Sequence, residues 1–242
     1  MKNKTLFNTD LINNMTIIDN YKRIKNEVIE TALKCGRNPD DIKIISVSKT
    51  FAVEKIQEAV NSGIKIFGES KVQEAYSKFP LVTGNYELHM IGHLQSNKSR
   101  EAVDMFDVIH SIDKVSTASK LNSEAEKKGK IQRIYLQLKT TDEINKHGAD
   151  SGEIITIAET ICTMKNIKIE GLMSIGPNTT DPLLIQKSFI ETAQTLDILN
   201  RNLKLNLTGL SMGMSGDFKI AVQEGATILR IGSAIFGDRN YI

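Results

Sequence analysis

The chain has no tryptophan, two cysteines and four prolines among its 242 residues, and aromatic residues make up 5% of it. The cysteines, Cys35 and Cys162, lie far apart and form no CxxC pair. A disulfide framework is therefore not expected, and both are interpreted as small apolar residues on helices. This composition is typical of the reducing cytoplasm, where we expect the protein to be located.

Charge of one sign is also scarce, because 31 basic and 29 acidic residues leave a net charge of +2. This balance gives no reason to expect a nucleic-acid or membrane partner. No run approaches the roughly 18 consecutive apolar residues of a membrane-spanning helix. The polar start lacks the apolar core of a signal peptide. We expect residues 1–10 to be frayed and residues 11–242 to form one domain, because no Pro/Gly/Ser-rich linker divides them.

What the chain does have is a regular alternation of short apolar runs and longer amphipathic stretches. Eight runs rich in β-branched residues are expected to be strands buried on both faces of a parallel sheet. They are residues 42–47, 64–67, 86–91, 108–112, 131–138, 167–173, 205–212 and 226–231. Helices are expected where apolar residues recur at helical spacing, over residues 11–34, 53–62, 154–164 and 188–199.

Strand–helix units repeated after a leading helix predict a single (β/α)8 barrel of the TIM type with an extra N-terminal helix. An open, doubly wound sheet is the alternative. In a barrel, the active site lies at the carboxyl ends of the strands. The polar residues that directly follow each apolar run are therefore the candidates for function.

Two charged residues stand out at these strand ends. Lys49 shares a strand face with Ile45 and Val47, so its amine is predicted to point into the barrel mouth, where it could attack a carbonyl. Arg230 interrupts the last apolar run, and a buried guanidinium needs a carboxylate, a phosphate or a ring nitrogen to meet its donors. A solvent-exposed lysine and a structural ion pair of the arginine are the alternatives.

The loops after the seventh and eighth runs, residues 211–217 and 232–233, are rich in serine and glycine. Loops at these places in β/α barrels direct backbone N–H groups at phosphate, although plain tight turns would have a similar composition. An amine, an arginine and an anion-binding loop fit an aldehyde-bearing phosphate held as a Schiff base. They fit a Schiff-base aldolase of sugar phosphates as well, and spacing does not separate the two.

The sequence predicts no metal site. His89 and His93 are four residues apart, but four residues of a strand span about 13 Å, too far for a shared ion. His110 is interpreted as a core residue, and His147, in a polar loop, is uninformative. The motifs GxGxxG, GxxxxGK[ST], HExxH and GxSxG are absent, so classical dinucleotide binding, P-loop, zinc-protease and α/β-hydrolase chemistry lose their usual support.

Six short segments occur along the chain in the same order as in a known family. They are Val47–Thr50, Phe67–Glu69, Ile91–Lys98, Gly171–Met173, Ser211–Ser215 and Arg230–Gly237. Together they resemble the pyridoxal-phosphate homeostasis protein family, whose members are barrels similar to the N-terminal domain of alanine racemase. The resemblance runs from about Leu11 to the C-terminus. It implies a fold type III protein with pyridoxal 5′-phosphate (PLP) as its cofactor.

The resemblance also implies roles for single residues. Lys49 would hold PLP as a Schiff base, and Arg230 would face the pyridine nitrogen. Because arginine does not readily give up a proton, the ring nitrogen would stay unprotonated and the cofactor would be a weaker electron sink. The phosphate would lie among four small residues, namely Ser211, Ser215, Gly232 and Ser233.

The chain departs from the family pattern at two points. Ser70 stands where asparagine is usual, and the shorter side chain is expected to lose its contact with the ring. Gly216 and Asp217 stand where two acidic residues are usual, and the phosphate loop is expected to tolerate this because glycine frees the backbone. Lys146 matches a position where the family often has lysine, and it is interpreted as a solvated loop charge.

The family is regarded as binding, buffering and delivering PLP, without an established turnover reaction. Ile242 closely follows the last apolar run, so we expect no second, β-rich domain like the one that supplies a catalytic tyrosine in alanine racemase. We therefore expect a monomeric protein of intracellular PLP homeostasis with apo-enzymes as recipients. The alternatives are a racemase-like enzyme, for which His89 and Lys49 are the candidate bases, and a sugar-phosphate aldolase.

Overall fold

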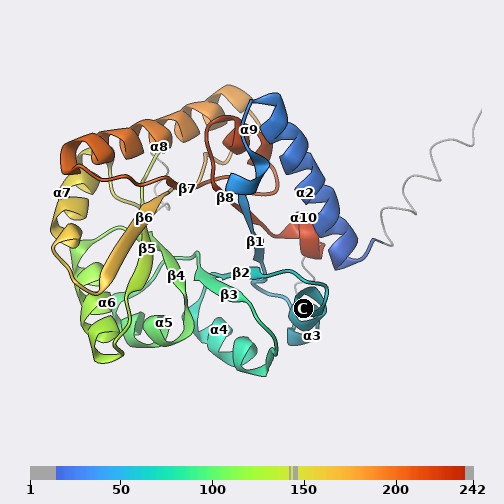
Figure 1. The fold of residues 1–242 in the computed structure, drawn as a ribbon, viewed down its shortest axis with the longest axis horizontal. Coiled ribbons are helices and arrows are strands. Elements are labelled where there is room, and N and C mark those ends of the chain that lie inside the picture. The colour runs from blue at the N-terminus through green and yellow to red at the C-terminus, as the bar shows by residue number, and fades with distance from the viewer. Residues whose placement is uncertain (1–14, 142, 144–146, 238–242) are drawn as a thin grey trace, which may run out of the picture.

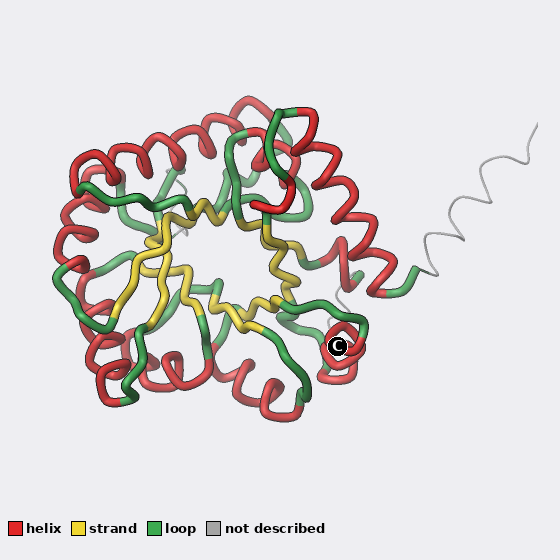
Figure 2. Tube along the Cα trace, in the orientation of Figure 1, coloured by secondary structure: helices red, strands yellow, loops and turns green. Residues whose placement is uncertain are grey.

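The structure, a computed structural model, describes residues 15–141, 143 and 147–237. Eight parallel strands close into a barrel in which each strand pairs with the next and β8 pairs with β1. Figure 2 shows the strands as a ring surrounded by helices. The strands are β1 (Lys43–Val47), β2 (Ile66–Glu69), β3 (Glu87–Met90), β4 (Val108–Ile112), β5 (Gln132–Gln137), β6 (Ile167–Met173), β7 (Gly209–Ser211) and β8 (Ile228–Ile231). The predicted (β/α)8 barrel is confirmed, and the open sheet is excluded.

Each strand is followed by a helix on the outside of the barrel, and one further helix precedes β1 (Figure 1). The α-helices are α2 (Ile17–Lys34), α3 (Val53–Asn61), α4 (Val72–Lys78), α5 (Ser99–Met105), α6 (Val115–Lys127), α7 (Ser151–Cys162), α8 (Pro182–Leu203), α9 (Phe218–Gln223) and α10 (Ser233–Phe236). Three 3-10 turns lie between elements, namely η1 (Pro39–Asp41), η2 (Phe79–Leu81) and η3 (Ser96–Lys98). Among the residues described, no helix is long and apolar enough to cross a membrane.

The leading helix α2 confirms the predicted N-terminal helix over its described part. It begins at Ile17 because Thr16 and Asp19 form a capping box, in which each side chain accepts from the other residue's backbone N–H. Its buried face packs against α9 and α10, beside which it lies in Figure 1. That face consists of Ile17, Ile24, Val28 and Ala32. The helix thereby closes the barrel wall next to β8 and β1.

Most strands lie within one or two residues of their predicted bounds, and two differ more, for physical reasons. β2 was expected over residues 64–67 but runs over Ile66–Glu69, because its last two residues pair with His89 and Met90 of β3. β7 was expected over residues 205–212 but covers Gly209–Ser211. The preceding helix α8 extends to Leu203, so the next residues are needed to return the chain to the barrel.

Alternating side chains of the strands separate two apolar cores. In β1, Ile44 belongs to the larger core between strands and helices, whereas Ile45 and Val47 belong to a smaller core inside the barrel. The inner core also contains Tyr135 and Ile228. The predicted inward face of the first strand is thus confirmed, and the inner core forms the floor beneath the barrel mouth.

Candidate functional site

Lys49 lies at the carboxyl end of the barrel, two residues after β1, and is half-buried. The preceding residue, Ser48, is buried and tied to the neighbouring strand. Its hydroxyl donates to Oε1 of Glu69 at 2.7 Å, and its carbonyl accepts from Nζ of Lys78 at 3.2 Å. The backbone that carries Lys49 is therefore fixed on its N-terminal side by side chains of β2 and α4.

Glu69 is fully buried beneath this turn. Burial raises the pKa of its carboxyl group to about 7, although the hydrogen bond from Ser48 and the charge of Lys78 oppose this effect. Its second oxygen, Oε2, has no hydrogen-bond partner among the described residues. A carboxyl group with one unsatisfied oxygen and this pKa is partly protonated at neutral pH.

The C-terminal side of Lys49 is anchored as well. The backbone N–H of Thr50 donates to Oε1 of Glu74 at 2.5 Å, and Lys78 forms an ion pair with the same carboxylate. Thr50 has a φ of 71°, a left-handed conformation that is uncommon for a β-branched residue. Both anchors of the turn reach across 24 to 30 residues of sequence, so the sequence analysis did not find them.

Arg230 lies in β8 and is 4% exposed. Its guanidinium donates to the carbonyl of Ser211 at 2.5 Å, to the hydroxyl of Ser211 at 2.9 Å and to the carbonyl of Ser174 at 2.7 Å. Burial lowers its pKa to about 10, with the charge of Asp217 opposing, so the group remains a cation at neutral pH. No ion pair of Arg230 is found among the described residues, so the structural ion pair considered as an alternative is absent there.

A chain of polar groups continues from Arg230 through the barrel interior. The hydroxyl of Ser211 contacts Nδ1 of His110 at 2.9 Å, and Nε2 of His110 contacts Nδ1 of His89 at 2.8 Å. His110 stacks on the ring of Tyr135 at 4.4 Å between centroids, and burial lowers its pKa well below the ordinary value. The prediction that His110 is a satisfied core residue is confirmed.

At its far end from Arg230, this row of polar side chains reaches a cavity of about 450 Å³. His89 lines the cavity together with Arg133, Tyr135 and Glu170. His89 is 2% exposed, and its Nε2 lies 3.5 Å from a carboxylate oxygen of Glu87. Because this cavity lies at the amino ends of the strands, His89 is poorly placed to exchange a proton with a ligand at the mouth. This location weakens the racemase alternative.

The loops after β7 and β8 meet beside the end of β1. A Cβ on Gly232 would lie 3.4 Å from Cβ of Val47, and the backbone N–H of Ala234 donates to the hydroxyl of Ser215 at 3.5 Å. Gly213 has a φ of 92°, and a Cβ there would lie 2.5 Å from Cβ of Ala221. This turn therefore requires glycine. The structure thus brings both predicted anion-binding loops next to the strand that carries Lys49.

The other predicted phosphate-site residues differ in exposure. Ser233 is exposed at the start of α10, and Ser215 is half-buried. Ser211 is fully buried, and its hydroxyl is shared between Arg230 and His110. The structure therefore places Ser211 beneath the mouth, as a support for the guanidinium.

Two family departures have clear positions in the structure. Ser70 is half-buried directly after β2. Asp217 closes the loop after β7, because its carboxylate accepts from the backbone N–H of Met214 at 2.5 Å. Burial raises the pKa of Asp217, with this hydrogen bond opposing. Lys146 and residues 1–14, including the segment expected to be frayed, lie outside the described residues.

Comparisons with known proteins agree on one family. The family described as alanine racemase, N-terminal domain, matches residues 16–240. The pyridoxal phosphate homeostasis protein of Vibrio alginolyticus is 38% identical over 234 residues, which are 93% of this chain and 99% of that protein.

Solved structures give the same result. PipY of Synechococcus elongatus PCC7942, solved with PLP bound, is 32% identical, covers 92% of this chain and all of its own, and has a TM-score of 0.81. Alanine racemase of Clostridium difficile 630 is 12% identical, with a TM-score of 0.68 over 87% of this chain and 56% of its own, and shares the barrel fold. The chain belongs to the pyridoxal phosphate homeostasis protein family, within the alanine racemase N-terminal domain family.

Proposed function

We propose that the protein binds PLP at the carboxyl end of the barrel, between the ends of β7, β8 and β1, and serves intracellular PLP homeostasis. The observation that carries this proposal is the cationic side chain of Arg230, buried in β8 and held by Ser174 and Ser211, with the two glycine-containing loops after β7 and β8 next to the end of β1. PipY, a relative with the same barrel, has been solved with PLP bound. The aldehyde of PLP supplies an electrophilic carbon with which a lysine amine forms a Schiff base.

The described residues fit this ligand. A guanidinium has five N–H donors, and three hydrogen bonds of Arg230 go to protein acceptors, which leaves two donors for a ring nitrogen. Ser215, Gly232 and Ser233 would surround the phosphate, since the first backbone N–H groups of a helix lack partners within it. Lys49 would provide the amine. Ser211 would keep the guanidinium oriented toward the ring.

Covalent labelling tests the proposal. The untagged protein is incubated with PLP, reduced with borohydride, digested and analysed by peptide mass mapping. We expect a pyridoxyl group on Lys49, because borohydride converts its Schiff base into a stable secondary amine. Lys49→Ala should abolish the adduct. Lys139→Ala is the matched control, since Lys139 is also half-buried and follows a strand at the same end of the barrel.

The labelling result can also contradict the proposal. An adduct spread over surface lysines, or an equal yield in Lys49→Ala, would mean that the mouth does not select PLP. If PLP-free protein formed a reducible adduct at Lys49 with simple aldehydes and with sugar phosphates, this result would favour the aldolase alternative.

The proposal extends to delivery, oligomeric state and location. We expect PLP-loaded protein to activate an apo-enzyme that depends on PLP, and sedimentation to show a monomer. The large exposed apolar residues are spread over different elements, for example Leu33, Leu81, Ile131 and Leu184. Both cysteines are exposed and free, which agrees with a reducing cytoplasm. No transfer above the rate seen with free PLP would argue for storage instead of delivery.

A further inference from the structure

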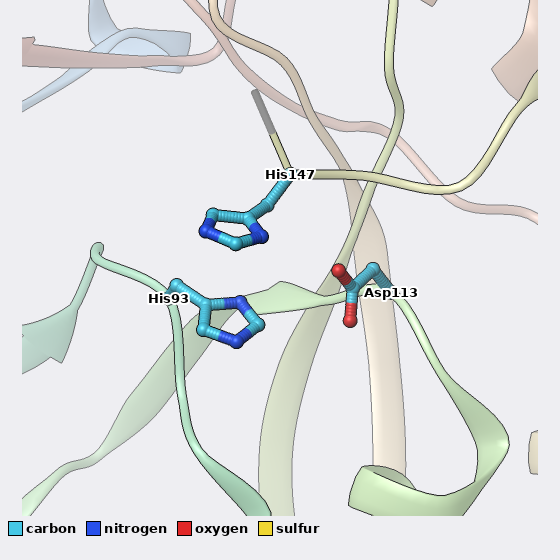
Figure 3. Close-up of side chains that lie close together, drawn as sticks. All are labelled: His93, Asp113 and His147. Atoms are coloured by element: carbon cyan, nitrogen blue, oxygen red, sulfur yellow. The ribbon is translucent and has the colours of Figure 1, made fainter. Parts of the chain in front are cut away.

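Three side chains gather at the barrel mouth on the side away from Arg230. His93 follows β3, Asp113 follows β4 directly, and His147 lies between β5 and α7. Because these strands are neighbours in the barrel, their carboxyl ends bring the three side chains together. One nitrogen of each histidine and one carboxylate oxygen lie within 4.8 Å of one another. Figure 3 shows the two rings face to face and the carboxylate beside them.

The backbone of His147 is held against the end of β5. Its carbonyl accepts from the side-chain amide of Gln137 at 2.7 Å. The following segment pairs with the strand end, since the carbonyl of Ala149 accepts from the N–H of Lys139 and its own N–H donates to the carbonyl of Gln137, each at 2.9 Å. Gly148 has a φ of 137°, and a Cβ there would lie 2.8 Å from the backbone nitrogen of Lys139. His147 therefore projects from an anchored position.

The backbone on both sides of His93 is also constrained. A Cβ on Gly92 would lie 2.2 Å from the carbonyl oxygen of Ser70, so only glycine allows this close approach. Leu94, on the other side, is 2% exposed and packs in the larger core between strands and helices. The imidazole of His93 is exposed between these two fixed residues.

The carboxylate of Asp113 is the unusual member of the group. The residue is 8% exposed. Among the residues that the structure describes, none forms a hydrogen bond with this carboxylate or with the ring nitrogens of His93 and His147. Its oxygens are not among the fully buried polar atoms, so they remain accessible at the mouth, and a cation bound beside them would supply the partner that this mostly buried side chain lacks. The rings stack with centroids 3.9 Å apart and 15° between their planes, which leaves their nitrogen atoms at the rim of the group.

The donor set restricts which cation fits. Two imidazole nitrogens and one carboxylate oxygen match three-ligand zinc sites, whereas magnesium and calcium prefer oxygen ligands alone. Zinc–ligand bonds of about 2.0–2.2 Å would place two ligand atoms roughly 3.4 Å apart. The side chains would therefore close by roughly 1–1.5 Å. At least one imidazole would also rotate out of the stack, because a ring nitrogen binds a metal in its own ring plane and the planes are now only 15° apart. A fourth position would remain for water or an anionic ligand.

We propose that His93, Asp113 and His147 form a binding site for a divalent transition-metal ion, with zinc as the ion that fits best. The sequence analysis predicted no metal site because it considered His93 with His89, which is buried and bonded to His110. The zinc site lies on β3, β4 and β5, whereas the PLP site is proposed on β7, β8 and β1. The two ligands therefore share no protein group.

Calorimetric titration of untagged, PLP-free protein with zinc chloride tests the site. We expect one zinc ion per chain. His93→Ala, His147→Ala and Asp113→Asn should each weaken binding by at least about tenfold, because each removes one of three ligands. Gln95→Ala is the matched control, since Gln95 is exposed in the same loop as His93. Circular dichroism checks that each variant is folded.

Cobalt(II) substitution provides a second readout. The ion should show the intense visible absorption of a four-coordinate site in the parent protein and in Gln95→Ala, and lose it in the three ligand variants. Absence of saturable zinc binding, or equal affinity in all variants, would overturn the proposal. Repeating the titration with PLP-loaded protein separates the two sites. Zinc binding that requires PLP and disappears in Lys49→Ala would mean that the cofactor chelates the ion, which also contradicts the proposed site.

Discussion

The two sides of the barrel mouth are built in opposite ways. On the side of β7, β8 and β1, the key cation, Arg230, is buried and fixed by three hydrogen bonds to protein acceptors. On the side of β3, β4 and β5, the key anion, Asp113, is buried without a hydrogen-bond partner among the described residues, and two exposed imidazoles face it. On the first side the protein holds its charged group in place and leaves two of its donors for a ligand, whereas on the second side no described protein group bonds to the charged group.

This difference indicates what each side contributes to folding. The Arg230 side is part of a continuous polar network that reaches His110 and His89 in the barrel interior. Its parts should therefore be needed for stability even without PLP. The side chains of His93 and His147 touch solvent, so their removal should affect ligand binding and leave folding nearly unchanged.

The largest expected effect comes from Arg230→Leu. The substitution would remove three hydrogen bonds to the guanidinium, at a total cost of about 3–5 kcal/mol. The buried carbonyl of Ser174 would lose its donor, whereas the Ser211 carbonyl keeps the backbone N–H of Ser174 and the Ser211 hydroxyl keeps its contact with His110. Urea unfolding of the PLP-free protein measures this loss. His93→Ala, on the opposite side, should change the unfolding free energy by less than about 0.5 kcal/mol. A loss below about 1 kcal/mol for Arg230→Leu would show that the guanidinium is not anchored as described.

The fold could be predicted from the sequence because its signal is local. Eight β-branched runs and the amphipathic stretches between them carry their own periodicity, and residues 108–112 and 167–173 were identified with the observed bounds. The end of β2 was missed because Gly68 and Glu69 have no apolar signal, and their strand conformation comes from pairing with β3.

The candidate site was predictable only in part, for a related physical reason. Lys49 and Arg230 could be proposed as site residues because they follow or interrupt apolar runs, which a single sequence reveals. The anchors Glu69 and Lys78 were missed because their contacts with Ser48 join elements 21 and 30 residues away. The grouping of His93 with Asp113 and His147 likewise depends on three strands lying side by side, and a single polar-loop histidine carries no such information.

The second prediction concerns Glu69, the buried carboxyl group beneath Lys49. Its folded-state pKa of about 7 lies above the ordinary 4.5, so folded protein holds a proton that unfolded chain releases between these pH values. The stability linked to this proton is fully present below about pH 4.5 and is lost as pH rises to about 7, by at most about 3 kcal/mol. Unfolding experiments between about pH 5 and pH 8 should show this decline in the parent protein, and a flatter profile in Glu69→Gln.

Glu74→Gln is the control for this pH profile. Hydrogen bonds from Lys78 and from the Thr50 backbone outweigh burial and lower the pKa of Glu74, so its own pH dependence lies below about 4.5. The variant should therefore keep the decline between about pH 5 and pH 8. If Glu69→Gln and the parent protein gave parallel profiles, Glu69 would be ionised throughout this range.

The smallest expected effect comes from glycine substitutions at two residues with strained backbone, one at the proposed PLP site and one far from it. Thr50, next to Lys49, and Lys204, at the end of α8, are the two described non-glycine residues with positive φ, 71° and 52°. Glycine removes a left-handed strain of roughly 1–2 kcal/mol at either position but costs about 0.5–1 kcal/mol in chain entropy. Each glycine variant should therefore gain between zero and about 1.5 kcal/mol in unfolding free energy. Only Thr50→Gly should also weaken PLP binding, measured by absorbance titration, because it loosens the turn that presents the Lys49 amine; equal PLP affinity in both variants would mean that the strained turn does not position this lysine.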